Sequence, residues 1–103
     1  MSNEYQELLE AEGFSWDKHN IEKNIEKHRV YPHEAEQIFF NSPLLIHDDA
    51  LHSTENEHRY LALGKTDEGR RLFCAFTMKD KRIRIISIRD MTPNERGAYH
   101  EHE

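Results

Sequence analysis

Basic side chains are concentrated in residues 65–89, and they are the first candidates for chemistry in this chain. This segment holds eight basic residues (Lys or Arg) and three acidic ones (Asp or Glu). Residues 1–64 hold five basic and thirteen acidic residues, and residues 90–103 hold one basic and four acidic residues. Guanidinium groups stay charged and can hold a phosphate through two parallel hydrogen bonds. A local basic patch can therefore bind a polyanion although the net charge is −6, because salt screens the more distant charges. The alternative is a strand edge that Lys and Arg protect against aggregation.

Arg84 and Arg89 lie in a segment, RIRIISIR at residues 82–89, that interrupts its own alternation. Ile86 follows Ile85 directly, which predicts a central strand covered on both faces at that point. Strict alternation puts Arg84 and Arg89 on opposite faces of the sheet. A β-bulge at the double Ile instead brings the two arginines to one face. Both arrangements are compatible with the sequence.

Two further groups of side chains can transfer protons. Lys27 and His28 are adjacent, so on a helix they diverge by about 100° and only one of them can face the core. His28 falls on the apolar side of its helix, so a packed core histidine is the alternative to a chemical role. In the loop 47–58, Asp49 can orient the imidazole of His52 for acid–base work, or the whole loop can be solvated. The spacing in this loop fits no standard metal motif, and we expect neither a metal ion nor another cofactor.

Length and composition indicate one small domain, residues 1–103, in which residues 1–12 are a flexible tail or a short helix. Charged residues make up 33% of the chain, and no apolar run approaches the roughly 20 residues that span a bilayer. The N-terminal segment lacks the basic start and apolar run of a secretory signal. We therefore expect a cytoplasmic protein without a membrane partner, and a single cysteine, Cys74, buried in the core.

Two helices are expected before the strands begin. Residues 14–16 form a short extended entry, and Asp17 can then cap a helix that ends near Arg29. A second helix begins at Pro32, which suits the first helical position, and residues 41–43, Asn-Ser-Pro, end it.

The period then changes to that of strands. Two of the three connections between these strands are of hairpin length, which predicts antiparallel pairing of the last three strands. Thr92 and Glu95 form a capping box that starts a last helix. The order of elements predicts an α+β fold with helices packed on an antiparallel sheet. The four expected strands are 44–47, 59–64, 70–77 and 81–89.

The same segments resemble the BrnT family of bacterial type II toxins over residues 14–100. The resemblance implies a RelE-like α+β fold with two N-terminal helices, an antiparallel sheet of about four strands and one C-terminal helix. The motifs that carry the resemblance are, in chain order, Phe14-x-Trp16-Asp17, Asn24-x-x-Lys27-His28 with Val30, Glu34-Ala35 with Ile38-Phe39 and Pro43, Asp49 with His52-Ser53 and Arg59, Leu63-Gly64, Gly69-Arg70, and Arg84-x-Ile86-Ser87-x-Arg89-Asp90-Met91 with Glu95 and Tyr99.

The resemblance further implies a toxin that cleaves RNA and inhibits translation. Its partners would be the RNA substrate and a BrnA-like antitoxin that neutralises it, with operator DNA bound only through that antitoxin. Metal-independent RNA cleavage requires a base for the 2′-OH, cations for the phosphate and an acid for the leaving oxygen. The catalytic candidates are Lys27, His28, His52, Arg84 and Arg89, and the substrate-binding candidates are Arg70, Arg71 and Ser87.

Purely structural roles are the alternative for the strand residues. Arg84 and Arg89 can instead form structural ion pairs with Glu95 or Asp90, and Ser87 can simply satisfy backbone groups. One of the neighbouring residues 70 and 71 is expected to face solvent only.

The chain also departs from the family pattern at three positions, one of which is Ile88, where many relatives have Ala. Asn20 stands where many relatives have Lys, which removes one potential phosphate contact. Arg29 stands where relatives have Gly, so it must accept a left-handed backbone at roughly 1 kcal/mol or end the helix differently. Asn20 and the acidic net charge favour a second hypothesis, in which the chain is a catalytically weak or inactive BrnT-like protein that acts as the binding partner of a DNA-binding antitoxin.

Overall fold

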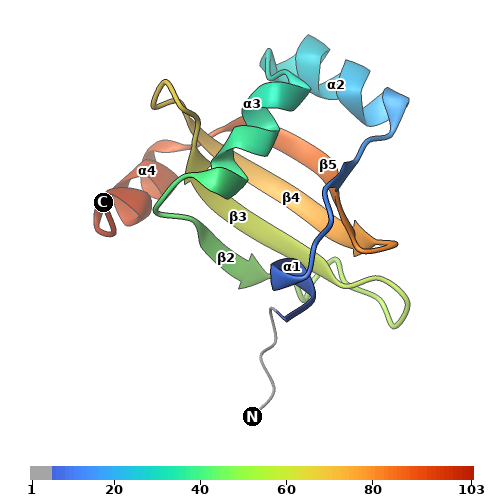
Figure 1. Ribbon diagram of the computed structural model, residues 1–103. Helices are drawn as coiled ribbons and strands as arrows, with labels where there is room; N and C mark the ends of the chain where they lie inside the picture. The colour runs from blue at the N-terminus through green and yellow to red at the C-terminus, as the bar shows by residue number, and fades with distance from the viewer. Residues whose placement is uncertain (1–5) are drawn as a thin grey trace.

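The computed structural model describes residues 6–103, which form a five-stranded sheet flanked by helices (Figure 1). The strand order is β1-β5-β4-β3-β2, in which β2 to β5 pair antiparallel with their neighbours and β1 runs parallel to β5. The α+β class is therefore as expected. The elements are α1 (Gln6–Leu9), β1 (Phe14–Ser15), α2 (Lys18–His28), α3 (Pro32–Gln37), the 3-10 helix η1 (Ile38–Phe40), β2 (Leu45–Asp48), β3 (Arg59–Lys65), β4 (Arg71–Lys79), β5 (Arg82–Asp90) and α4 (Pro93–His100).

The predicted helix ends are confirmed by their caps. The Asp17 side chain accepts hydrogen bonds from the first free N–H groups of α2, and Arg29 ends that helix in the left-handed conformation with φ 55°. Pro32 occupies the first turn of α3. Thr92 and Glu95 form the reciprocal capping box at the start of α4. Local side-chain chemistry thus sets these boundaries.

The expected count of four strands and three helices was too low. Phe14–Ser15 forms a fifth strand that pairs parallel with Ile83 and Arg84, so the sheet is not purely antiparallel. Two residues are too few to show an alternating pattern, and the sequence therefore indicated only an extended entry. Part of the N-terminal segment forms the short helix α1, whereas residues 1–5 lie outside the described part of the chain.

One face of the sheet forms the core together with the loop and helices that follow α2. Cys74 lies in this core as predicted, and burial raises the pKa of its thiol. In Figure 1, α3 and η1 cross this face in front of the strands. The buried members of the core are Val30, Ala35, Ile38, Tyr60, Ala62, Leu72, Cys74, Phe76, Ile83, Ile85 and Ile88.

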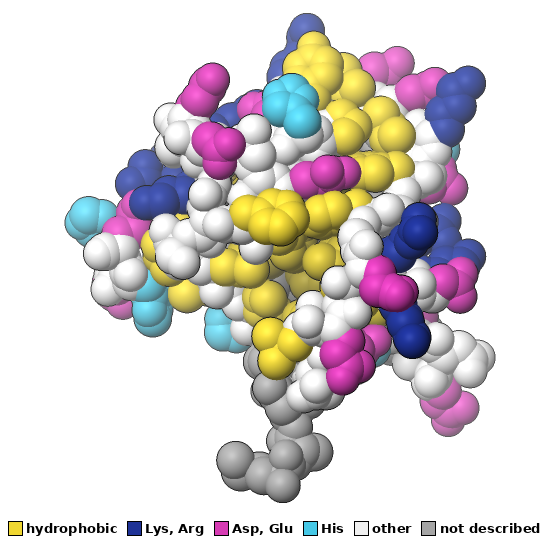
Figure 2. All heavy atoms as spheres, viewed as in Figure 1, with side chains coloured by type: hydrophobic (Ala, Val, Ile, Leu, Met, Phe, Trp, Pro, Cys, Tyr) yellow, Lys and Arg dark blue, Asp and Glu magenta, His cyan; other side chains and the backbone are white. Residues whose placement is uncertain are grey.

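The outer surface of the helix-covered face is hollowed by an apolar groove between α1, η1 and β2 (Figure 2). Phe40 is 79% exposed beside it and Leu9 is 73% exposed. No residue that the sequence singled out for catalysis or substrate binding lines this groove.

Within residues 6–103, no helix has the length and hydropathy that a membrane span requires.

Gly64 permits η1 to lie directly on β3, and this contact generates a first prediction. A Cβ atom at position 64 would lie 2.9 Å from Cβ of Ile38 and 3.3 Å from its carbonyl oxygen. We expect Gly64→Ala to lower the free energy of unfolding by about 1–3 kcal/mol, because η1 must shift. The matched control is Gly97→Ala in α4, where a Cβ meets open space and should raise stability by about 0.5–1 kcal/mol. Urea unfolding followed by circular dichroism measures both changes, and equal stability of Gly64→Ala and wild type would contradict the packing described.

Candidate functional site

The face of the sheet opposite the core carries most of the basic side chains of residues 65–89, and we call it the open face. Strand alternation and the pairing register assign its positions in β2 to β5. Seven of them are Arg or Lys and none is Asp or Glu, so these strands present one sign of charge. They are Leu45, His47, Arg59, Leu61, Leu63, Lys65, Arg71, Phe73, Ala75, Thr77, Lys79, Arg82, Arg84, Ser87 and Arg89.

A β-bulge in β5 puts the two arginines on this face together. The pairing with β4 shifts between Ala75 and Phe76, which leaves Ile86 of β5 without an opposite residue. Because one extra residue reverses the alternation that follows it, Arg84 and Arg89 lie on the same face. The bulge is thus the arrangement that the protein adopts, and strict alternation is excluded.

β5 is an interior strand with β1 and β4 as its neighbours, although β4 occupies the middle of the sheet. Beyond Arg84, the outer edge of β5 is covered by α2 instead of another strand. Nζ of Lys23 donates to the carbonyl oxygen of Ile86 at 3.3 Å, and Oδ1 of Asn24 accepts from the amide of Ile88 at 3.2 Å. The consecutive isoleucines therefore reflect a bulge under a helix.

Arg89 forms the ion pair that was the alternative to a catalytic role. Its two terminal nitrogens donate to the two carboxylate oxygens of Glu95 at 2.8 and 3.0 Å, and its guanidinium lies 4.0 Å from the centre of the Phe73 ring. The hydrogen bonds from Arg89 lower the pKa of Glu95 despite partial burial. The Arg89 side chain is 29% exposed, so one side of this pair reaches solvent.

Arg84 is held more loosely, by a partner that the sequence did not suggest. Its terminal nitrogen lies 3.4 Å from Oδ2 of Asp17. The backbone N–H groups that Asp17 caps, and then Arg84, lower the pKa of that carboxyl group. Arg84 and Arg89 face Thr77 and Phe73 on β4, which are four residues and therefore roughly 13 Å of strand apart.

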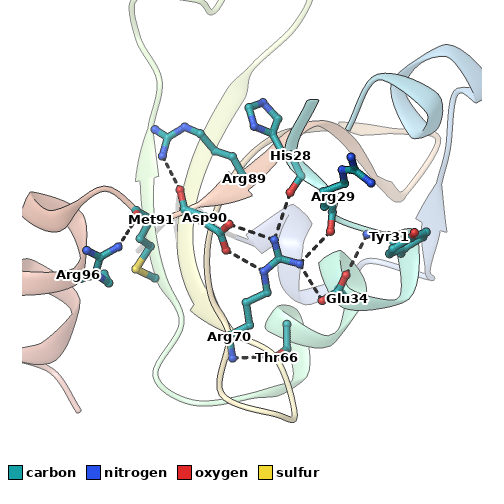
Figure 3. A network of polar contacts seen from close by, with 10 residues as sticks. All are labelled: His28, Arg29, Tyr31, Glu34, Thr66, Arg70, Arg89, Asp90, Met91 and Arg96. Carbon is teal, nitrogen blue, oxygen red and sulfur yellow. Dashed lines mark hydrogen bonds and ion pairs between the residues drawn. The ribbon is translucent and has the colours of Figure 1, made fainter. Parts of the chain in front are cut away.

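Arg70 is not on the open face. It is the centre of a network of polar contacts at the C-terminal end of β5, around Asp90 (Figure 3). All five N–H groups of its guanidinium have acceptors, which are the carboxylates of Asp90 and Glu34 and the carbonyl oxygens of His28 and Arg29, at 2.7 to 3.2 Å. The hydrogen bonds from Arg70 lower the pKa of Asp90, and Asp90 in turn raises the pKa of Arg70. Arg70 therefore joins the ends of α2, α3 and β5 and has no donor left for a substrate.

Arg71 and Ser87 do lie on the open face. Arg71 donates three hydrogen bonds to the carboxylate of Glu103 at 2.7 to 3.0 Å, and Lys65 lies 3.3 Å from the same group. These contacts, together with those of Glu95, bring α4 and the end of the chain over one end of the open face. The opposite end keeps the side chains of Lys79 and Arg82, which pair with no carboxylate among the described residues.

Lys27 and His28 occupy the last turn of α2, the helix that lies along the outer edge of β5. Lys27 is exposed and His28 is half-buried, so His28 is not a fully packed core histidine. Its carbonyl oxygen accepts from Arg70, while its ring points away from that guanidinium (Figure 3). The charge of His28 also contributes to the lowered pKa of Asp90.

His52 and Asp49 form the pair that the sequence suggested, with 2.8 Å between Nδ1 and Oδ2. Their loop precedes Arg59, which pairs with Thr77 and so lies at the Arg84 end of the sheet. His28 lies near Asp90 at the other end, roughly 17 Å of strand away, and the structure does not bring the two histidines together. His58 pairs with Asp48 at 2.7 Å, and residues 6–103 contain no cluster of three potential metal ligands.

Three comparisons relate this chain to known proteins. A family model described as the ribonuclease toxin BrnT of type II toxin-antitoxin systems matches residues 16–95. No curated protein matches the chain in sequence. Among solved structures, the ribonuclease toxin BrnT of Brucella abortus is similar with a TM-score of 0.58 and 17% identity, covering 78% of this chain and 96% of that one. At this identity, the structural match shows a shared fold.

The adjacent arginines provide a matched test of which one is structural. We expect Arg70→Met to lower the free energy of unfolding by about 2 kcal/mol, because it leaves two carboxylates and two helix-end carbonyls without their donor. Arg71→Met removes an ion pair at the surface and should cost much less than Arg70→Met. Urea unfolding at pH 7 measures both, and similar losses for the two variants would contradict the assigned network.

The stability difference between wild type and Arg70→Met has a predictable pH dependence. Because the folded-state pKa of Asp90 is lowered, its contribution to stability is present above the unfolded value of about 3.9 and is lost as the pH falls through the lowered value. The stability difference between wild type and Arg70→Met should therefore shrink between pH 5 and pH 2. A difference that stays constant or grows over this range would contradict the role given to Asp90.

Proposed function

The chain belongs to the BrnT family of ribonuclease toxins of type II toxin-antitoxin systems, and from this premise we propose that it binds RNA on its open face. Seven Arg or Lys and no carboxylate at the strand positions of that face support this assignment. A surface of one charge attracts a polyanion even on an acidic protein, because the near field dominates at physiological salt. We further propose that cleavage needs no metal ion and inhibits translation.

In this proposal, Arg84 and Arg89 hold the phosphodiester, and the hydroxyl of Ser87 between them donates to a phosphate oxygen. The phosphate replaces Asp17 and Glu95 as partner of the two guanidiniums. The exchange is easier at Arg84, whose contact with Asp17 is a single one of 3.4 Å at the surface, than at Arg89, whose two hydrogen bonds to Glu95 the phosphate must replace with two of its own. Arg71 extends the binding surface, while Arg70 supports it from the core side.

For proton transfer, we favour His28 with Lys27 over His52. Both residues belong to α2, which lies along β5 and contacts the bulge. One of them would take the proton from the 2′-OH and the other would return a proton to the leaving oxygen. His52 could act only on a phosphate bound at the Arg84 end of the open face.

Membership of the family also suggests a protein partner and a cellular location. We propose that a BrnA-like antitoxin neutralises the chain in the cytoplasm and that operator DNA is contacted only through this antitoxin. The chain would act as a single domain with a RelE-like fold.

The open face is tested by RNA cleavage and binding with purified protein in EDTA. Arg84→Ala and Arg89→Ala should each lower the cleavage rate at least about tenfold, since each removes a cation from the developing charge. Each should also reduce the slope of log affinity against log salt by about 0.7, the value expected for one phosphate contact to single-stranded RNA. Lys18→Ala is the charge-matched control, because Lys18 projects from the side of α2 opposite Lys27 and should leave both values unchanged.

Wild-type rates in both arginine variants would contradict the site assignment. Activity that disappears in EDTA and returns with a divalent metal would instead contradict metal independence.

A second candidate function has a specific observation in its favour, because both arginines on β5 already have carboxylate partners. In this alternative, the chain binds an antitoxin without cleaving RNA. Expression in bacteria with and without the neighbouring reading frame discriminates between the two. The proposed toxin should arrest growth and the arrest should be relieved by the antitoxin, whereas absence of both arrest and cleavage by pure protein would favour the binding role.

A further inference from the structure

The outer edge of β5 beyond Arg84 has no strand beside it, and α2 supplies partners for two backbone groups at the β-bulge. β1 pairs only with Ile83 and Arg84, so the edge of β5 beyond them is open to the helix. Asn24 accepts from the amide of Ile88 through its side-chain oxygen, and Lys23 donates to the carbonyl oxygen of Ile86. These two contacts hold the residues on either side of Ser87.

Asn24 is an unusual residue for the position it occupies. It is 1% exposed and is the buried residue of α2, where an apolar side chain would pack without polar groups to satisfy. Its Nδ2 has no hydrogen-bond partner among the described residues. A buried polar group without a partner is costly. The presence of asparagine at this position is therefore explained by its side-chain oxygen, which accepts a hydrogen bond from the backbone N–H of Ile88.

The bulge in turn decides where the substrate-facing groups lie. Without the extra residue, Ser87 and Arg89 would share the core face with Ile85, and only Arg84 would remain on the open face. A bulge whose edge is not held can shift its pairing by one residue. Holding the Ile88 amide fixes the strand immediately before Arg89.

We propose that Asn24 is a positioning residue for RNA cleavage, acting through the Ile88 amide to fix the bulge that aligns Ser87 and Arg89 with Arg84. This inference rests on the proposed function. Asn24 is remote from solvent and does not touch RNA. Its effect is on the alignment of groups that do, so it should alter the rate of the chemical step far more than the affinity for RNA.

Asn24→Leu tests the assignment, because leucine keeps the branched shape and the number of side-chain heavy atoms and removes the accepting oxygen together with the unsatisfied Nδ2. In the chain of residues 1–103, three quantities are measured: urea unfolding, amide hydrogen exchange at Ser87, Ile88 and Arg89 by NMR, and single-turnover cleavage alongside the Kd for an RNA with 2′-O-methyl groups. Asn20→Leu, one turn earlier on α2, is the matched control and should leave all three quantities close to wild type.

We expect Asn24→Leu to remain folded, to exchange the Ile88 amide faster, and to lower the single-turnover rate about tenfold or more, as misplaced catalytic groups do. Its Kd should change less than about threefold, because all seven cations of the open face remain. If this variant does not fold, Asn24→Ala, which adds no bulk, replaces it in the same measurements.

Each outcome decides the question. A wild-type single-turnover rate in a folded Asn24 variant would overturn the positioning role and leave the proposed function intact. Equal losses of rate and affinity, or a rate loss that matches the unfolded fraction, would show a merely structural role. A wild-type chain that cleaves no RNA would instead overturn the proposed function, and the positioning role would fall with it.

Discussion

One extra residue in β5 determines how charge is distributed over this molecule. Because side chains alternate across a strand, the unpaired Ile86 moves everything after it to the opposite face. Ile83, Ile85 and Ile88 can then all enter the core while Arg84 and Arg89 both remain outside it. The bulge thus separates an apolar face, closed by α3 and η1, from a basic face that α4 and the end of the chain partly cover.

The arginines of the sheet differ in the number of their hydrogen-bond partners. This difference distinguishes the structural Arg70 from the arginines proposed to bind substrate. Arg70 has every donor engaged by groups from three elements, so it cannot leave without exposing several unpaired partners. Arg84 and Arg89 each have one carboxylate near solvent. The single contact of Arg84 is weak, whereas Arg89 is held by two hydrogen bonds, and a phosphate with its larger charge can compete for the same guanidinium geometry.

Patterns within a few residues predicted much of this structure, whereas features that depend on distant residues were not predictable. The caps at Asp17 and Thr92 and the strands β2 to β5 follow from local chemistry and periodicity. The double isoleucine allowed two registers, and the choice depends on Asn24, which lies 64 residues before the Ile88 amide that it binds. Likewise, adjacent basic residues look equivalent in sequence, although one is structural and its neighbour faces the open side. The fifth strand was missed because its pairing with β5 is visible only in the folded chain.

The central claim is that the bulged, basic face of the sheet is where RNA binds, and NMR titration tests it most directly. The isotope-labelled chain is titrated with a single-stranded RNA carrying 2′-O-methyl groups, which cannot be cleaved by attack of the 2′-oxygen. We predict that the largest shifts fall on Phe73, Arg84, Ser87 and Arg89 and weaken as salt is raised. Shifts confined to the apolar groove beside Phe40, with none on the open face, would contradict the account.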